Sequence, residues 1–159
     1  MLKYVDVKEV FAEIPDEITL AISISQCPLR CKGCHSQYLW EDIGDELNTE
    51  SLSALLTGHI GVTCVCFMGG DNDPAQVDNL AAWVKANHPR VRTAWYSGRD
   101  TISSQIHLQN LDYIKIGRYD EKQGPLNKQE TNQILYKVEQ SVDGEAVLTD
   151  ITHRFWKRS

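Results

Sequence analysis

Short apolar runs typical of buried strands alternate with helical segments along this chain. Residues 62–67 form a continuous apolar run, as expected of a parallel strand that is buried on both faces. Leucines recur at helical spacing between residues 50 and 57, just before this run. Strands that alternate with helices predict βα units, a parallel sheet and right-handed crossovers. Further strand-like runs occupy residues 19–25, 91–96 and 111–116, and weaker ones occupy residues 134–138 and 146–148.

The length of the chain limits the form of this sheet. A closed eight-stranded (β/α) barrel typically needs about 250 residues, and this chain has 159. The expected fold class is therefore α/β, with a shortened partial (β/α) barrel of parallel strands in a single domain, residues 1–159. Residues 1–17 are mixed in character, and we interpret them as a turn-like lead into the first strand.

One helix has a well-defined start in the sequence. Asp73 is a suitable N-cap, Pro74 suits the first helical position, and Gln76 completes a capping-box pattern. Apolar residues then recur at helical spacing until the sequence Asn87-His88-Pro89, which ends the helix. The pattern predicts a helix that begins at Pro74, soon after the strand of residues 62–67.

Three of the five cysteines lie close together in the segment Gln26-Cys27-Pro28-Leu29-Arg30-Cys31-Lys32-Gly33-Cys34-His35. This C-x3-C-x2-C segment directly follows the strand-like residues 19–25, and α/β sheets present their active sites at the ends of strands. Thiolates are soft ligands that suit iron–sulfur clusters, and a cubane cluster normally takes four of them. A structural zinc ion also takes four protein ligands. Three thiolates therefore leave one iron of a cubane cluster open to further chemistry.

The composition indicates the cellular compartment of the protein and the kinds of partner that it does not bind. An odd number of cysteines, clustered rather than dispersed, indicates a reducing compartment and a metal site rather than a disulfide framework. The net charge of −6 argues against non-specific binding to nucleic acid. No apolar run approaches the roughly 20 residues of a membrane-spanning helix, and the N-terminus lacks the apolar region of a signal peptide. We therefore expect a cytoplasmic protein.

A second candidate binding segment, Gly69-Gly70-Asp71, follows the apolar run of residues 62–67. Two glycines allow a backbone to approach a ligand closely, and the Asp71 carboxylate can accept hydrogen bonds from an ammonium group. The alternative is an ordinary turn at the end of a strand, followed by the helix cap at Asp73. Its position after the cysteine segment favours the first interpretation.

The C-x3-C-x2-C segment resembles the signature of the radical S-adenosylmethionine (SAM) enzymes. The sequence Phe67-Met68-Gly69-Gly70-Asp71 is similar to the Gly-Gly-Glu-type motif of that superfamily, with aspartate in place of the more usual glutamate. Three later segments follow in the order found in the activating proteins of anaerobic (class III) ribonucleoside-triphosphate reductase. They are Lys115-Ile116-Gly117-Arg118-Tyr119, Gly124-Pro125-Leu126 and Thr131-Asn132-Gln133. The resemblance covers roughly residues 19–136 and also implies the partial barrel of radical SAM enzymes.

This resemblance implies a [4Fe-4S] cluster on Cys27, Cys31 and Cys34, the catalytic and metal-binding residues, with SAM bound at the open iron. One electron from the reduced cluster would cleave the sulfonium C–S bond and give methionine and a 5′-deoxyadenosyl radical. The radical would abstract a hydrogen atom from a backbone glycine of the large subunit of the anaerobic reductase. An electron donor such as a flavodoxin-type protein is also implied. No nucleic-acid or membrane partner is expected.

The resemblance also suggests which residues contact SAM. The Gly-Gly-Asp segment is expected to receive the amino group, and Gly33, Cys34 and His35 are expected on the adenine side. Many superfamily members carry an aromatic residue at the position of Gly33, but glycine agrees with the reductase-activating branch. His35 can then supply the ring contact to adenine. The alternative for His35 is a loop histidine that faces solvent.

Two other functions remain open for this sequence. The first is a radical SAM enzyme that acts on a small molecule or on another glycyl-radical enzyme, such as a formate-lyase-type partner. The second is a non-catalytic adaptor in which zinc is bound by the three cysteines together with Cys64, Cys66 or His35. Cys64 and Cys66 point to the same face of a strand, where buried cysteines often serve as small apolar side chains. We interpret both as core residues.

Three further features have two interpretations each. Residues 95–98 end the third strand and either contact SAM or provide core aromatic residues and a turn. Lys115, with Asp112, either faces the site or is solvated. The basic, aromatic residues 153–158 either form a solvated terminus or dock a partner.

Overall fold

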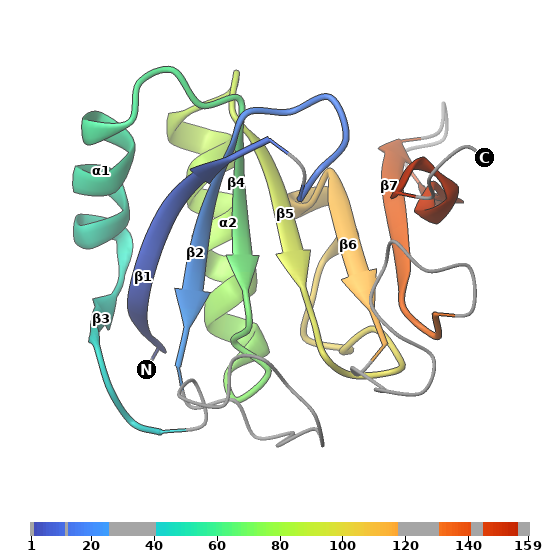
Figure 1. Ribbon diagram of the computed structural model, residues 1–159, viewed down its shortest axis with the longest axis horizontal. Coiled ribbons are helices and arrows are strands. Elements are labelled where there is room, and N and C mark those ends of the chain that lie inside the picture. The colour runs from blue at the N-terminus through green and yellow to red at the C-terminus, as the bar shows by residue number, and fades with distance from the viewer. Residues whose placement is uncertain (1, 12, 26–40, 118–130, 141–144, 156–159) are drawn as a thin grey trace.

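The structure is a computed structural model that describes residues 2–11, 13–25, 41–117, 131–140 and 145–155. These residues form a mixed sheet of eight strands and two α-helices (Figure 1), with the strand order β3-β1-β2-β4-β5-β6-β7-β8. The elements are β1 (Leu2–Val10), β2 (Thr19–Ile24), β3 (Asp45–Leu47), α1 (Thr49–Gly58), β4 (Cys64–Met68), α2 (Pro74–Asn87), β5 (Arg92–Tyr96), the 3-10 turn η2 (Leu108–Asn110), β6 (Tyr113–Ile116), β7 (Ile134–Gln140), β8 (Ala146–Asp150) and the 3-10 turn η3 (Thr152–Phe155).

The four central strands are parallel and confirm the α/β class. Strand β4 pairs with β2 on one side and with β5 on the other, and β5 pairs with β6, each in parallel. The outer strands are antiparallel, with β1 and β3 beside β2 and with β7 and β8 beside β6. The expectation of parallel strands therefore holds for the centre of the sheet only. The partial-barrel form stays a prediction.

The first strand, β1, corrects the interpretation of residues 1–17 as a turn-like lead. It pairs with β2 along most of its length, with a register shift between Tyr4 and Asp6. A β-bulge of this kind adds one residue to one strand and breaks the alternation of side chains. Leu2 is buried, Tyr4 and Val7 pack against the same core, and the spacing between these apolar residues is therefore uneven. Because of this bulge, residues 2–10 lack the strict alternation of polar and apolar residues by which a strand is predicted from sequence.

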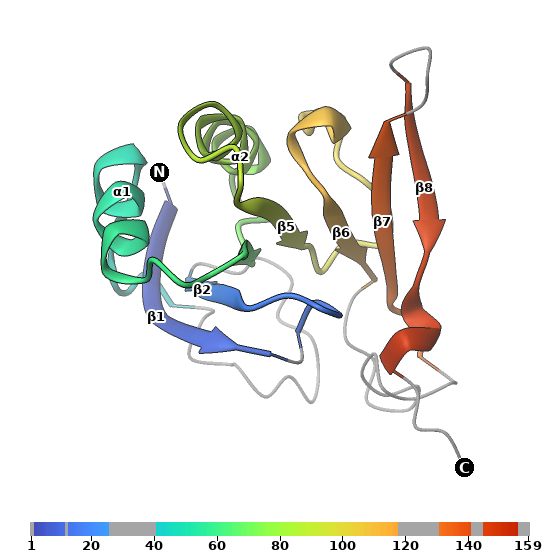
Figure 2. The same cartoon turned by 90° about the horizontal axis from the view of Figure 1, so that it is seen from above.

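Both α-helices pack on one face of the sheet, which we call the helix face (Figure 2). The start of α2 is as predicted, with Asp73 as N-cap, Pro74 in the first turn and the Gln76 amide donating to the Asp73 carboxylate at 3.3 Å. Helix α1 begins with a reciprocal capping box between Asn48 and Ser51. The buried stripes of the two helices cover the strands with the residues Leu52, Leu56, Val77, Leu80, Ala81 and Val84.

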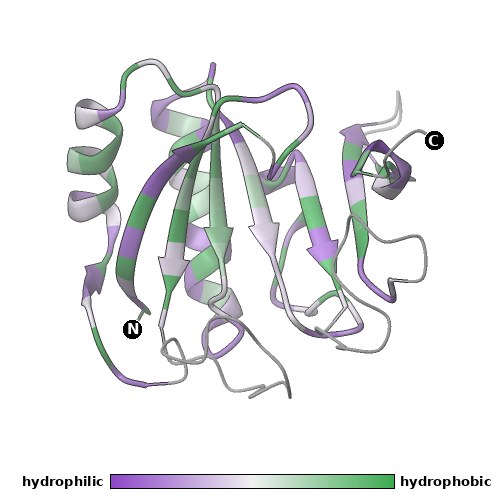
Figure 3. Cartoon of the chain, viewed as in Figure 1, coloured by the Kyte–Doolittle hydropathy of each residue, from purple (hydrophilic) through white to green (hydrophobic). Residues whose placement is uncertain are grey.

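The central strands bury side chains on both faces. Strand β4 is largely hydrophobic along its length, whereas β1 is banded with polar and apolar residues (Figure 3). Phe67 and Trp95 belong to the core of the helix face. The other side of the sheet, which we call the opposite face, carries a second cluster that includes Cys64, Cys66, Ala94, Tyr96 and Ile14. Burial on both faces explains why these strands read as continuous apolar runs.

Candidate functional site at the carboxyl edge of the sheet

The parallel strands β2, β4, β5 and β6 end at the same edge of the sheet (Figure 1). The chain leaves β2 at Ile24 and enters the cysteine segment two residues later. The predicted site residues Cys27, Cys31, Gly33, Cys34 and His35 lie outside the described residues. The Gly-Gly-Asp turn leaves β4 at the same edge. The fold therefore brings the second candidate binding segment next to the end of β2, after which the cysteine segment follows in the sequence.

The two glycines of this turn lie against β2 and α2. Gly69 and Gly70 have φ angles of +112° and +92°, in the left-handed region that favours glycine. A Cβ atom on Gly69 would lie 3.0 Å from the Ile24 carbonyl oxygen, and one on Gly70 would lie 2.7 Å from Cγ2 of Val77. Both glycines are thus required by the packing of the chain itself. The turn therefore packs directly against Ile24, the last residue of β2.

The carboxylate of Asp71 ties this turn to the turn that follows β5. Asp71 is only 5% exposed. One carboxylate oxygen accepts the Ser97 hydroxyl at 2.5 Å, and the other accepts the Gly98 amide at 2.9 Å. A carboxylate offers about four acceptor positions, so these two bonds do not exhaust it. The bond between Asp71 and Ser97 could not be predicted from the sequence, because it joins residues 26 positions apart across two strands.

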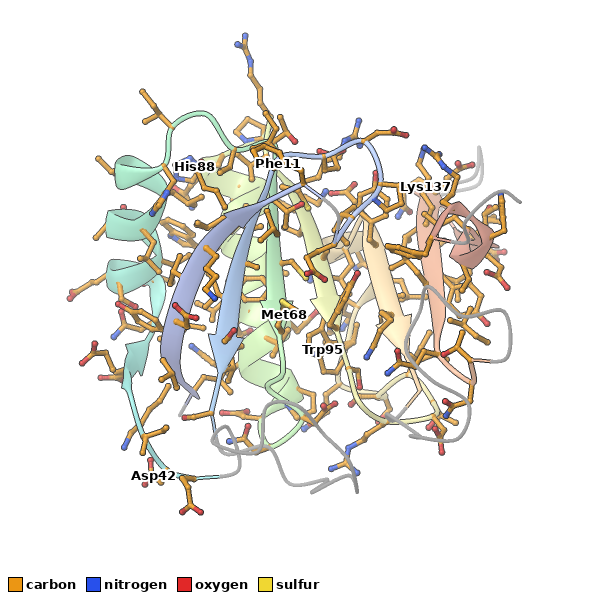
Figure 4. The ribbon with its side chains drawn as sticks, in the orientation of Figure 1. Phe11, Asp42, Met68, His88, Trp95 and Lys137 are labelled. Carbon is orange, nitrogen blue, oxygen red and sulfur yellow. The ribbon has the colours of Figure 1, made fainter. Side chains whose placement is uncertain are left out.

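Trp95 reinforces the same turn from the helix face. Its side chain is 1% exposed, and its indole Nε1 donates a hydrogen bond to the Gly69 carbonyl at 2.6 Å. Trp95 and Met68 lie on neighbouring strands near the same end of the sheet (Figure 4). Trp95 is therefore a core aromatic residue, and it positions Gly69 through a buried hydrogen bond. This function was missed from the sequence, although a buried indole generally needs an acceptor.

We expect the variant Ser97→Ala to lower the free energy of unfolding by about 1–3 kcal/mol, because it leaves a buried carboxylate oxygen without its donor. Urea unfolding followed by far-UV circular dichroism measures this change. Ser103→Ala is a matched control, because the Ser103 hydroxyl accepts the Gln105 amide much as Ser97 accepts that of Arg99, with no buried carboxylate attached. Equal losses in the two variants would contradict a specific bond to Asp71.

A row of side chains on the opposite face lines this edge. Strand register places Ser23, Met68, Tyr96, Lys115 and Leu135 side by side across five strands. Lys115 is 9% exposed, and its Nζ lies 5.3 Å from the centre of the Tyr96 ring. This distance is within the range of a cation–π contact. Lys115 therefore lies at the carboxyl edge of the sheet and is largely shielded from solvent.

Asp112 lies at the other end of β6 and takes no part in this row. Its carboxylate pairs with the Lys85 ammonium group and accepts the Thr93 amide at 2.9 Å. Asp112 is thus a structural residue of the amino edge. Lys115 and Asp112, considered together in the sequence, therefore lie at opposite ends of β6, and only Lys115 lies at the carboxyl edge.

Cys64 and Cys66 are core residues, as expected. Both are fully buried in the cluster of the opposite face. Burial raises the pKa of both thiols well above the ordinary value. A raised pKa keeps a thiol protonated, whereas metal ligation needs the thiolate. Among the described residues, no group of three or more His, Cys, Asp or Glu side chains is arranged to hold a metal ion.

These buried thiols predict a loss of stability at alkaline pH. The unfolded chain releases the thiol protons near pH 9.0, but the folded chain keeps them because burial raises the pKa. Above that pH the unfolded state binds fewer protons than the folded state, so the free energy of unfolding falls as the pH rises. Burial also raises the pKa of Tyr113, to about 12, which extends the decline. Urea unfolding at pH 8, 9 and 10 measures it.

The matched control is Cys64→Ala with Cys66→Ala in one chain, which removes both thiols. We expect a smaller decline between pH 8 and 10 in this variant than in the parent chain. An identical decline would show that other groups cause the alkaline loss.

No helix of the described residues is long and apolar enough to cross a membrane. A family model described as the 4Fe-4S single cluster domain matches residues 18–153. The chain therefore belongs to the 4Fe-4S single cluster domain family. Comparison with curated proteins gave no match, and comparison with solved structures gave none. Membership supports one [4Fe-4S] cluster, and the clustered cysteines outside the two core thiols are its candidate ligands.

Proposed function

We propose that this chain is a radical SAM activase that generates a glycyl radical on the large subunit of anaerobic ribonucleoside-triphosphate reductase. The observation that carries the proposal is the contact between the Gly-Gly-Asp turn and Ile24. Ile24 ends β2, and Cys27 follows three residues later. A cluster-binding segment and a polar turn suited to an amino acid group thus leave neighbouring parallel strands at one edge.

The donor set fits a cubane cluster with one open iron. Cys27, Cys31 and Cys34 supply three thiolates, and the two remaining cysteines, Cys64 and Cys66, are buried as thiols in the core. When bound, the cluster supplies one electron for cleavage of the sulfonium C–S bond of SAM. The same burial argues against Cys64 and Cys66 as the fourth ligand of the zinc adaptor, so that alternative depends on His35.

The residues of the edge have distinct tasks in this proposal. Asp71 accepts the SAM ammonium group on a remaining lone pair while Ser97 and Gly98 hold its carboxylate in place. The indole N–H of Trp95 donates to the Gly69 carbonyl from the helix face and holds that carbonyl in place. A carboxylate that is oriented by its neighbours loses little freedom on binding, which favours affinity. Gly33 and His35 are proposed to lie on the adenine side.

The proposed partner follows from the later segments of the chain. Lys115 and Ile116 end β6 at the carboxyl edge and Gly117 follows them, while residues 131–133 precede β7 beside this strand. A Cβ atom on Gly117 would lie 2.7 Å from the Asn132 carbonyl oxygen, so the two segments touch. Both resemble segments of the reductase-activating proteins. The hydrogen atom is then taken from a backbone glycine of the partner, with an electron donor such as a flavodoxin-type protein.

Formation of 5′-deoxyadenosine tests the cleavage step. The chain is reconstituted anaerobically with iron and sulfide, reduced with dithionite and incubated with SAM. We expect a brown protein that forms 5′-deoxyadenosine and methionine in equal amounts. A colourless chain that holds one zinc ion and forms no 5′-deoxyadenosine would instead support the adaptor.

Electron paramagnetic resonance tests the partner. The reduced, SAM-loaded chain is mixed with the anaerobic reductase large subunit, and a glycyl-radical signal is expected. A formate-lyase-type enzyme and a small-molecule control are treated in parallel. A signal on the formate-lyase-type enzyme alone would reassign the partner, and deoxyadenosine without any protein radical would favour a small-molecule substrate.

A further inference from the structure

One hydroxyl group joins two described residues that flank the cysteine segment, Ser25 before it and Ile43 after it. Ser25 precedes the segment and is 0% exposed. Its Oγ donates a hydrogen bond of 2.6 Å to the carbonyl of Ile43, which lies 18 positions later and follows the segment. This hydrogen bond closes residues 25–43 into a loop, with the buried Ser25 on one side and the exposed Ile43 on the other.

The N-terminal strand β1 supplies the other half of this base. The carbonyl oxygen of Lys3 accepts the Ser25 amide at 2.9 Å, and the Lys3 ammonium group pairs with Asp42 at 2.7 Å. Asp42 lies beside Ile43, so β1 holds both the entry and the exit of the segment. The ion pair is partly exposed, with Asp42 64% exposed, and surface pairs of this kind contribute little. The hydrogen bonds of the buried Ser25 therefore contribute more than this ion pair to holding the flanking residues on β1.

Gly44 allows the exit to lie directly on β1. Its φ angle is +98°, and a Cβ atom there would lie 2.2 Å from the carbonyl oxygen of Tyr4. A contact below 3.0 Å with backbone atoms forces one of the two segments to move. Glycine is thus required for residues 42–44 to reach β1. We call Lys3, Ser25, Ile43 and Gly44 together the base clamp.

We propose that the base clamp positions the cysteine segment for its cluster, with Ser25 and Gly44 as positioning residues that slow the loss of iron. The inference rests on the proposed ligands Cys27, Cys31 and Cys34, all of which lie between the two ends. Fixing both ends lowers the entropy that three converging thiolates must lose on binding. Groups that orient ligands from outside commonly change metal affinity by roughly 10–100-fold.

Iron release from the reconstituted protein tests this proposal without any measurement of catalysis. Under anaerobic conditions, the wild-type chain, Ser25→Ala and Gly44→Ala are each mixed with excess ferrous chelator, and the absorbance of the complex gives the release rate. We expect release to be roughly tenfold faster in both variants. The matched control is Thr93→Val, because Thr93 is also 0% exposed and its Oγ1 donates at 2.6 Å to the Asn110 carbonyl, but at the amino end of β5.

Each outcome decides the proposal. Faster release in Ser25→Ala and Gly44→Ala, with Thr93→Val within twofold of the wild type, supports the base clamp. Equal acceleration in Thr93→Val, or no acceleration in Gly44→Ala, overturns it, and so does a wild-type chain that takes up no iron. Gly44→Ala decides the matter alone if Ser25→Ala does not fold. A chain that retains iron but forms no 5′-deoxyadenosine would remove the proposed function and leave the base clamp standing.

Discussion

The Cys27→Ala variant is expected to form no 5′-deoxyadenosine above background while it remains folded. In the proposed function three thiolates hold a cubane cluster with one iron left open, and two thiolates cannot hold such a cluster. The fold survives because the buried clusters on both faces of the sheet are built from other residues. Iron content, 5′-deoxyadenosine formation and far-UV circular dichroism of the purified variant measure the three parts of this expectation.

Cys66→Ala is the matched control for this experiment. It makes the same chemical change at a thiol that is 0% exposed and whose pKa is raised by burial. We expect this variant to retain its iron and its 5′-deoxyadenosine formation, with a loss of stability from the small cavity. Retained 5′-deoxyadenosine in Cys27→Ala, or its loss in Cys66→Ala, would reverse the assignment of ligands and core thiols.

If the chain cleaves SAM as proposed, the Gly70→Ala variant is expected to lose most of that cleavage, and its free energy of unfolding is expected to fall by about 1–3 kcal/mol. Its Cβ atom would lie 2.7 Å from Cγ2 of the buried Val77, and φ is +92°. Val77 is 0% exposed and has little room to yield, so we expect the turn to move away from α2 and to displace the Asp71 carboxylate from its bonds to the β5 turn. Urea unfolding and the 5′-deoxyadenosine rate measure the two effects.

Gly61→Ala separates these effects from the general cost of replacing glycine. A Cβ atom on Gly61 has no heavy atom within 4 Å, and its φ lies outside the left-handed region. We expect the Gly61 variant to match the wild type in SAM cleavage and to be equally stable or slightly more so. Full activity in Gly70→Ala would contradict a precise position for the Gly-Gly-Asp turn.

The sequence predicted the elements whose patterns are local. The apolar run of β4, the capped start of α2 at Asp73 and the placement of the Gly-Gly-Asp turn after β4 all appear as expected. Strand β1 was missed because its bulge near Tyr4 interrupts the alternation, and β3 was missed because it has three residues. Such features depend on pairing partners rather than on local periodicity.

The candidate site also has a part that local sequence predicts and a part that depends on strand pairing. The three cluster cysteines stand out by their spacing, and they stay a prediction because they lie outside the described residues. The bonds of Asp71 to Ser97 and of Trp95 to Gly69 each join residues 26 positions apart. No spacing rule links such residues, because only the parallel pairing of β4 with β5 brings them together. The positioning residues of the site therefore required the fold.

Ile14 limits how deeply anything can enter the opposite face. It is 0% exposed within the cluster of Cys64, Cys66 and Ala94, and the Tyr96 hydroxyl donates to the carbonyl of the neighbouring Glu13. The amino-terminal half of that face is thus already filled by the chain itself. A ligand of the carboxyl edge therefore meets the ends of β2, β4, β5 and β6, and it cannot extend into this filled part of the opposite face.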